Sequence, residues 1–201
     1  MDLGIPLEKL EADPAVIFAL DRNLRLIFCN ASWDRFAREN DGEAWLAEHA
    51  LGKNIMDVVT EPLQPFYQRA YASARETAEP WEHQYECSSP EKYRVFQMRI
   101  LPLPTTRGFL VVNSLVVERD HGADRSEHLA AANAYETKDG LITICSHCRR
   151  TLRADGKAWD WVPDHLRQRG TKVSHGLCMP CYSYFYPDLH GPNQGGFLLD
   201  N

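Results

Sequence analysis

The chain has 201 residues, of which 44% are hydrophobic and 25% are charged. This composition is typical of a folded globular protein and excludes a wholly disordered chain, with room for a medium domain followed by a small one. The formal net charge of -6 argues against a protein that coats DNA. The acidity lies in the first part, because residues 1–120 hold 13 Lys and Arg against 19 Asp and Glu, whereas residues 121–201 hold nine of each.

The N-terminal stretch MDLGIPLEKLEADP is acidic and lacks the basic region and apolar run of a signal peptide. No later apolar run approaches membrane-spanning length, so we expect a cytoplasmic protein that does not associate with membranes. Disulfides are disfavoured in a reducing compartment, and four of the six cysteines form two close pairs. Such usage indicates metal or redox chemistry.

The first third of the chain predicts a hairpin followed by helices. Residues 15–30, AVIFALDRNLRLIFCN, contain two apolar β-favouring runs joined by a polar turn. Asn30 suits the N-cap of a helix over 31–40, and Gly42 suits its end. A short helical piece over 43–52 and a longer helix over 62–79 follow, the latter with Phe66, Ala70, Tyr71 and Ala74 on one face.

Three strands are predicted next. Residues 80–87 alternate in polarity, with Trp81, His83 and Tyr85 on the apolar side. The second run, 93–103, is expected to end at Pro102 and Pro104, because proline cannot donate to a sheet. The third, GFLVVNSLVVER, is almost continuously apolar, which predicts a central strand. Residues 120–139 are polar and Ala-rich and predict a linker with a marginal helix.

This order of elements resembles the PAS domain, a family of sensory modules. The resemblance rests on PAVIFALDRNLRLIFCNASWDRFA, LGKNIMDVV and FLVVNSLVVE and covers residues 10–119. It implies a five-stranded antiparallel sheet with flanking helices, a ligand cavity between them, and dimerisation through this domain.

The ligand is not fixed by the resemblance. The NCRFLQ-like stretch of flavin-binding light sensors is absent, so we do not expect flavin. Haem-binding PAS domains use a side chain that faces the cavity, and His83 and His49 are the candidates here. A histidine on such a face is more often a hydrogen-bonded core residue, and haem is therefore the less favoured reading.

The last part of the chain carries C-x2-C, 29 intervening residues and a second C-x2-C. Cys145, Cys148, Cys178 and Cys181 supply four thiolates, the ligand set of a closed tetrahedral zinc site. We expect one structural Zn²⁺, with iron and a dithiol switch as alternatives, and no catalysis at a metal whose coordination is filled. The intervening Asp155-Gly156 suits a tight turn, and Pro180 suits the start of a helix.

Four thiolates around Zn²⁺ leave a formal charge of -2, which requires nearby hydrogen-bond donors or cations. The residues beside the cysteines in the sequence are candidates for this supporting role: His175, His147, Arg149 and Arg150.

The segment 140–187 also resembles a C-terminal element that follows sensory or receiver domains in bacterial signalling proteins. The matching residues are CSHCRR, WDWV and SHGLCMPCY, in that order. This resemblance implies an architecture but no activity.

The predicted fold class is α+β: a PAS-like five-stranded antiparallel sheet with flanking helices, plus a small treble-clef-like or ribbon-like zinc module. The expected divisions are a helical lead (1–9), a sensor domain (10–119), a linker (120–139), a four-cysteine module (140–190) and a flexible tail (191–201).

The function predicted from these features is a bacterial signalling adaptor. Its PAS domain would sense a small ligand, redox state or partner, and its zinc module would act through contact with a protein of the pathway. A nucleic-acid-binding regulator and a haem or redox sensor are the alternatives, but the acidic chain favours neither DNA nor RNA. We expect no enzyme, because H-E-x-x-H, G-x-S-x-G and P-loop motifs are absent.

Overall fold

The structure, a computed structural model, describes residues 3–40, 42–122, 125–167 and 172–189. The predicted tail over 191–201 lies outside the described residues. None of the helices in these ranges is long and apolar enough to cross a membrane.

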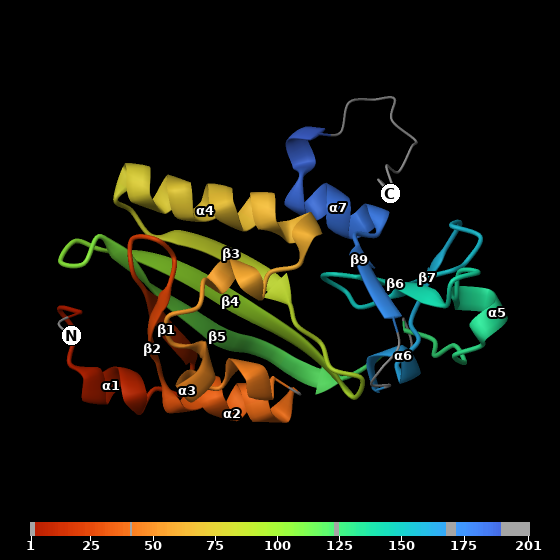
Figure 1. The fold of residues 1–201 in the computed structure, drawn as a ribbon, viewed down its shortest axis with the longest axis horizontal. Coiled ribbons are helices and arrows are strands. Elements are labelled where there is room, and N and C mark those ends of the chain that lie inside the picture. Colours follow the sequence, from red (N-terminus) through yellow and green to blue (C-terminus); the bar gives the residue numbers. More distant parts are fainter. Residues whose placement is uncertain (1–2, 41, 123–124, 168–171, 190–201) are drawn as a thin grey trace.

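An antiparallel sheet of five strands forms the centre of the first part of the chain (Figure 1). Its strand order is β2-β1-β5-β4-β3. The long apolar run therefore occupies the middle position, as predicted. The strands are β1 (Val16–Leu20), β2 (Leu26–Cys29), β3 (Trp81–Glu86), β4 (Lys92–Leu103) and β5 (Gly108–Asp120).

Helices connect the first two strands to the last three. They are α2 (Ala31–Glu39), α3 (Ala47–Ala50) and α4 (Gln64–Thr77), with short 3-10 turns η1 (Glu43–Trp45), η2 (Ile55–Asp57) and η3 (Glu61–Leu63); α1 (Leu7–Glu11) precedes the sheet. Asn30 caps α2 as predicted, because its side chain accepts the N–H of Trp33. In α4 the buried residues recur at helical spacing, and the helix ends where Ala78 adopts φ 56°.

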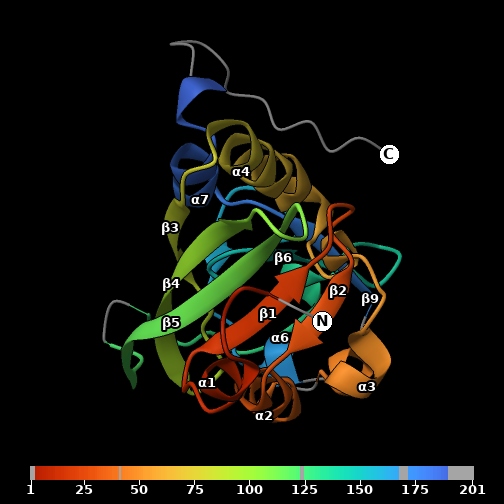
Figure 2. The ribbon, with the colours of Figure 1, turned by 90° about the vertical axis from the view of Figure 1, so that its left-hand side faces the viewer.

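The sheet has two differently covered faces. The inner face packs against α4 and the short helices through a large cluster that includes Leu20, Tyr71 and Phe109. A smaller cluster beneath α1, which includes Leu10 and Leu110, covers part of the other face. Figure 2 shows α1 and α4 on opposite sides of the sheet.

The second part of the chain builds a small sheet of order β8-β7-β6-β9. Its strands are β6 (Leu141–Cys145), β7 (Thr151–Leu152), β8 (Trp159–Asp160) and β9 (Lys172–Gly176), and its helices are α5 (Ala132–Tyr135), α6 (Asp164–Arg167) and α7 (Met179–Phe185), followed by η4 (Pro187–Leu189). β6 and β9 run parallel, whereas the β6–β7 and β7–β8 pairs are antiparallel. We call residues 140–189 the cysteine module.

The predicted class, a PAS-like sheet with helices and a cysteine cluster, is confirmed. The second of the three predicted strands ends where it was expected, because β4 stops at Leu103, directly before Pro104, and Pro102 lies inside the strand. β3 begins at Trp81 opposite Ile100, so only the β5 side of β4 is paired at Pro102. A residue without an N–H group is accommodated at such a half-paired position.

Candidate metal centre and ligand cavity

The first cysteine pair lies in a tight turn after β6. The N–H of Cys145 donates to the carbonyl of Arg150 at 2.8 Å, and the N–H of Arg149 donates to the carbonyl of Cys145 at 3.1 Å. Arg149 adopts φ 63°, a left-handed conformation that reverses the chain within a few residues. This turn brings the Cys145 and Cys148 side chains to the same buried site.

The second pair arrives at that site through the parallel pairing of β6 and β9. Cys145 lies opposite Gly176, two residues before Cys178. Cys178 is the N-cap residue of α7, and Cys181 follows in the first turn of that helix, which starts with a proline in its first two positions as expected.

The four Sγ atoms lie within 4.8 Å of one another, and all four cysteines are buried free thiols. The Cys145–Cys178 and Cys148–Cys178 sulfur distances are 3.8 and 3.6 Å. A tetrahedron with metal–sulfur bonds of about 2.3 Å has edges of about 3.8 Å. The cluster could therefore bind one metal ion, since the two sulfur distances given match the edge of such a tetrahedron.

The thiols affect one another's ionisation. Hydrogen bonds from the three neighbouring thiols lower the pKa of Cys145. Hydrogen bonding to the neighbouring sulfurs raises the pKa of Cys178 and of Cys181 far above the ordinary value. Four thiolates so close together therefore require a cation.

Two side chains support the sulfurs directly. The His147 Nδ1 atom lies 3.3 Å from Cys181 Sγ, and Arg150 Nη1 donates to Cys148 Sγ at 3.9 Å. The other two candidates lie elsewhere: His175 is exposed on β9, and the Arg149 guanidinium hydrogen-bonds the Cys87 thiol. Burial lowers the pKa of His147, so its imidazole is neutral at pH 7.

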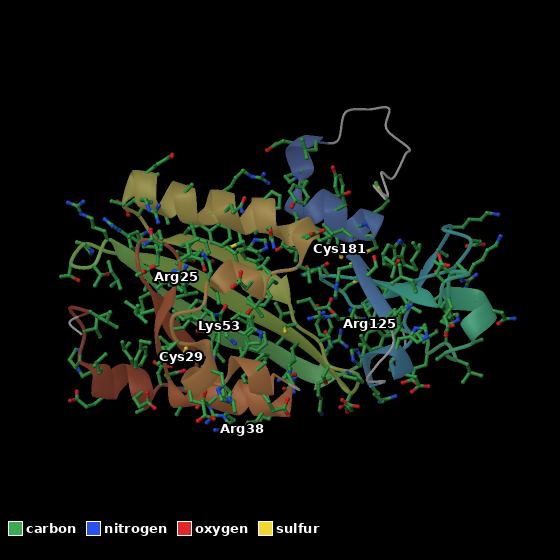
Figure 3. All side chains as sticks on the ribbon, in the orientation of Figure 1. Arg25, Cys29, Arg38, Lys53, Arg125 and Cys181 are labelled. Carbon is green, nitrogen blue, oxygen red and sulfur yellow. The ribbon has the colours of Figure 1, made fainter. Side chains whose placement is uncertain are left out.

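His147 also joins the cysteine module to β3. Its Nε2 atom accepts the backbone N–H of Glu86 at 2.8 Å, which leaves the proton on Nδ1 for the bond to Cys181. The Glu86 carboxylate pairs in turn with the buried Arg125 guanidinium. Figure 3 shows Arg125 and Cys181 at this junction between the two parts. No local pattern predicts the Glu86–Arg125 pair, because 39 positions separate the two residues.

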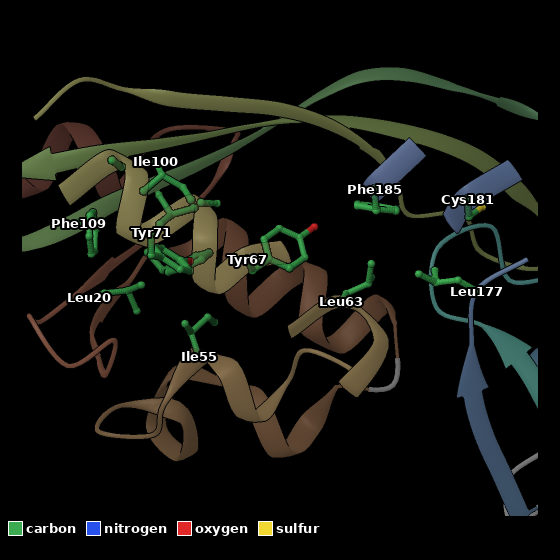
Figure 4. Close-up of a cluster of buried hydrophobic side chains, with 14 of the residues drawn as sticks. Leu20, Ile55, Leu63, Tyr67, Tyr71, Ile100, Phe109, Leu177, Cys181 and Phe185 are labelled. Carbon is green, nitrogen blue, oxygen red and sulfur yellow. The ribbon is translucent and has the colours of Figure 1, made fainter. Parts of the chain in front are cut away.

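Aromatic packing extends the junction along α7. The Phe185 ring contacts the rings of Phe66 and His83 at centroid distances of 4.9 and 5.4 Å. Tyr184 and Tyr186 donate their hydroxyl protons to backbone carbonyls of the sensor at 2.8 and 2.6 Å. One hydrophobic cluster consequently runs from the sensor sheet to the cysteines, as Figure 4 shows.

Neither haem candidate lies in the cavity of the sensor. His83 is half-buried among Trp81, Phe66 and Phe185, and burial lowers its pKa to about 4. His49 is exposed on α3 beside Glu48. Neither lines the cavity within the described ranges.

The cavity itself has a volume of about 1080 Å³ and lies between the sheet and the helices. Its interior is mainly aromatic and aliphatic, with Trp33, Tyr67 and Phe96 in the walls. At one end the lining passes to the cysteine module, which contributes Ser146, His147, Arg149, Leu166, Arg167 and Phe185. The module is therefore part of the cavity wall.

Several solved structures resemble this chain. A PAS domain from Colwellia psychrerythraea has 14% sequence identity and a TM-score of 0.42, covering 55% of this chain and 92% of its own. The PAS domain of Bordetella pertussis BvgS has 17% identity and a TM-score of 0.36, covering 57% and 80%. The Vibrio cholerae VqmA dimer has 13% identity and a TM-score of 0.42, covering 56% and 52%.

Among curated proteins, an uncharacterised 104.1 kDa protein in the hypE 3′ region of Rhodobacter capsulatus is 26% identical over 132 residues. The match covers 62% of this chain and 14% of that protein, so the chain spans a small part of its relative's length. The family model described as the PAS fold matches residues 10–123, more than half of the chain. Together with the five-stranded sheet and its helices, this match shows that the chain belongs to the PAS family.

Proposed function

We propose that this protein is a cytoplasmic bacterial signalling adaptor. Its PAS domain senses a small ligand in the cavity, and its cysteine module holds one structural Zn²⁺ and passes the state of the sensor to a protein partner. The observation that carries this proposal is the position of His147, which contacts Cys181 on one side and the β3 backbone on the other.

Zinc is favoured by the donor set. Four thiolates are soft ligands, and a complete tetrahedral shell leaves no open position for a substrate. The ion would be held by Cys145, Cys148, Cys178 and Cys181, with His147 and Arg150 donating to the sulfurs. Zinc supplies structural cross-linking at such a site and no redox chemistry. The hydrophobic core within the module is small, so binding of the ion would contribute much of its folding free energy.

Communication between ligand and module follows from the shared wall of the cavity. A ligand that shifts the backbone at the end of β3 alters the hydrogen bond from the Glu86 N–H to His147. The change in His147 then alters its hydrogen bond to Cys181 Sγ. The effect is reciprocal, because loss of the ion would also change the wall that the ligand contacts.

Metal analysis of the full chain tests the zinc assignment. We expect one zinc per chain, no visible absorption band, and loss of the metal in the Cys178→Ser variant. Cys29→Ser is the matched control, because Cys29 is a half-buried cysteine outside the cluster. Iron with a visible spectrum, or full zinc content in Cys178→Ser, would contradict the assignment.

Hydrogen exchange tests the coupling. Removal of zinc with a chelator should increase the exchange rate of the Glu86 amide, because its acceptor His147 loses its partner. The amide of Ala19 in the centre of the sheet serves as the internal reference. Equal protection of the Glu86 amide with and without zinc would refute a link between the two parts.

A further inference from the structure

The polar end of the cavity is built by the cysteine module and contains groups that the metal site does not use. Ser146 and Arg149 lie on the turn that holds the first cysteine pair, and both line the cavity. Among the described residues, neither side chain donates a hydrogen bond to the sulfurs of Cys145, Cys148, Cys178 and Cys181.

The Ser146 hydroxyl is buried without a partner. The residue is 9% exposed, and its Oγ atom has no hydrogen bond among the described residues. A buried hydroxyl left unpaired is destabilising, so such groups commonly mark a place where a ligand or an ordered water supplies the missing bond.

Four Lys and Arg residues line the cavity, and Arg149 is the one that forms no ion pair with a carboxylate of the described residues (3–40, 42–122, 125–167 and 172–189). The other wall cations are already paired: Lys92 with Asp120 at 2.7 Å, Arg94 with Glu118 at 2.7 Å and Arg167 with Glu91 at 3.3 Å.

The acidic groups near this end of the cavity do not neutralise Arg149. Glu86 pairs with Arg125 and accepts from Ser88, and Glu91 pairs with Arg167. Glu39 also lines the cavity, from the end of α2. The Arg149 guanidinium instead contacts the uncharged Cys87 thiol, whose pKa is raised by burial despite the nearby arginines. The charge of Arg149 thus remains available to an anion.

The rest of the cavity suits an apolar molecule. Trp33, Phe36, Tyr67, Tyr71 and Phe96 form its walls. The Tyr85 hydroxyl donates to Asn113 Oδ1 at 3.0 Å, so these two polar groups of the cavity already bond to each other. An aromatic wall of this kind takes up a rigid hydrophobic body, and Arg149 at the module end offers a charged partner to a polar group.

We propose that the cavity binds an amphipathic organic anion. Its apolar body lies among the aromatic walls, and its carboxylate or comparable acidic group pairs with the Arg149 guanidinium and accepts the hydrogen bond of Ser146 Oγ. This inference rests on the proposed function, because it names the chemical class of the sensed ligand.

A pair of fluorescent probes tests the charge requirement. 8-Anilinonaphthalene-1-sulfonate and N-phenyl-1-naphthylamine share an aromatic body and differ in one anionic group. Each is titrated into the zinc-loaded 201-residue chain, and competition between them shows whether they occupy the same cavity. We expect both to bind, with the anionic probe losing affinity as ionic strength rises.

The decisive variant is Arg149→Asn. Asparagine adopts a left-handed backbone readily, so the turn retains its conformation while the charge is removed. Affinity for the anionic probe should fall about tenfold or more, as expected for loss of a charge-assisted hydrogen bond, while affinity for the neutral probe is unchanged. Arg107→Asn is the matched control, because Arg107 also has a positive φ of 54° but lies on the exposed turn between β4 and β5.

The outcomes separate the two proposals. If both probes bind and Arg149→Asn leaves the anionic probe unaffected, or if Arg107→Asn weakens it equally, the anion site is refuted and the sensor cavity stands. If neither probe binds the wild-type protein, the ligand-sensing cavity is refuted together with the anion site. Ser146→Ala provides a second variant with an intact turn, in which the anionic probe should bind several-fold more weakly.

Discussion

Replacement of His147 by alanine should weaken both the metal site and the junction with the sensor. The change removes the bond to Cys181 Sγ and leaves the Glu86 N–H without its acceptor. A lost bond to a charged sulfur costs about 1.5–3 kcal/mol, and an unpaired half-buried N–H costs about 1–3 kcal/mol. Since part of the N–H cost is recovered by water, we expect a decrease of about 3 kcal/mol in the free energy of unfolding.

The assay combines zinc competition against a chromophoric chelator with urea unfolding of the zinc-loaded protein. His147→Ala should lower zinc affinity by about 10–100-fold, the range seen when a group that supports a metal ligand is removed. His175→Ala is the matched control, because His175 is also close to a cysteine in sequence but is exposed. Equal effects of the two substitutions on zinc affinity would show that His147 has no special role.

Three further changes probe the fold. Phe185→Ala should lower the free energy of unfolding by about 3–5 kcal/mol, because Phe185 is 2% exposed. Both parts of the chain should still unfold in one urea transition. An unchanged midpoint of that transition would exclude a hydrophobic core shared by the two parts. Gly108→Ala should lower the free energy of unfolding, measured by thermal denaturation, by about 3 kcal/mol, because the new Cβ would lie 1.9 Å from a backbone oxygen at the end of β1. Gly176→Ala is the control and should have much less effect, because a Cβ there meets no atom closer than 3.5 Å. Asn30→Ala should lower the free energy of unfolding in urea by about 3 kcal/mol, because the buried side-chain amide makes hydrogen bonds to five backbone groups at 2.9–3.2 Å. A decrease below about 1 kcal/mol would mean that water replaces those hydrogen bonds.

The sequence predicted the elements of the sensor well because its patterns are local. Alternation placed Trp81, His83 and Tyr85 on one side of β3, and the burial of that strand confirms it. The N-cap at Asn30 was also predicted, but its bonds to the segment around Leu10 and Asp13 were not. Those bonds depend on how α1 packs on the sheet, which no local pattern records.

The cysteine cluster was predictable because two closely spaced cysteine pairs in one chain serve few purposes other than binding a metal ion or forming disulfides. Which neighbours support the sulfurs was not predictable, since Arg149 and Arg150 are adjacent in a tight turn and contact different partners. Sequence proximity to Cys178 likewise suggested His175, but the side chain is exposed on β9. The contact between His147 and Glu86 depends on how the turn after β6 packs against the end of β3, and only the fold reveals it.

The aromatic packing of α7 also determines how the protein can be divided in the laboratory. A fragment cut after the sensor sheet would present Phe66 and His83 to water, since the helix that covers them would be missing. Bare aromatic patches of this kind promote self-association. Dimers observed with such a fragment would report on the cut surface, so oligomeric state has to be measured on the intact polypeptide.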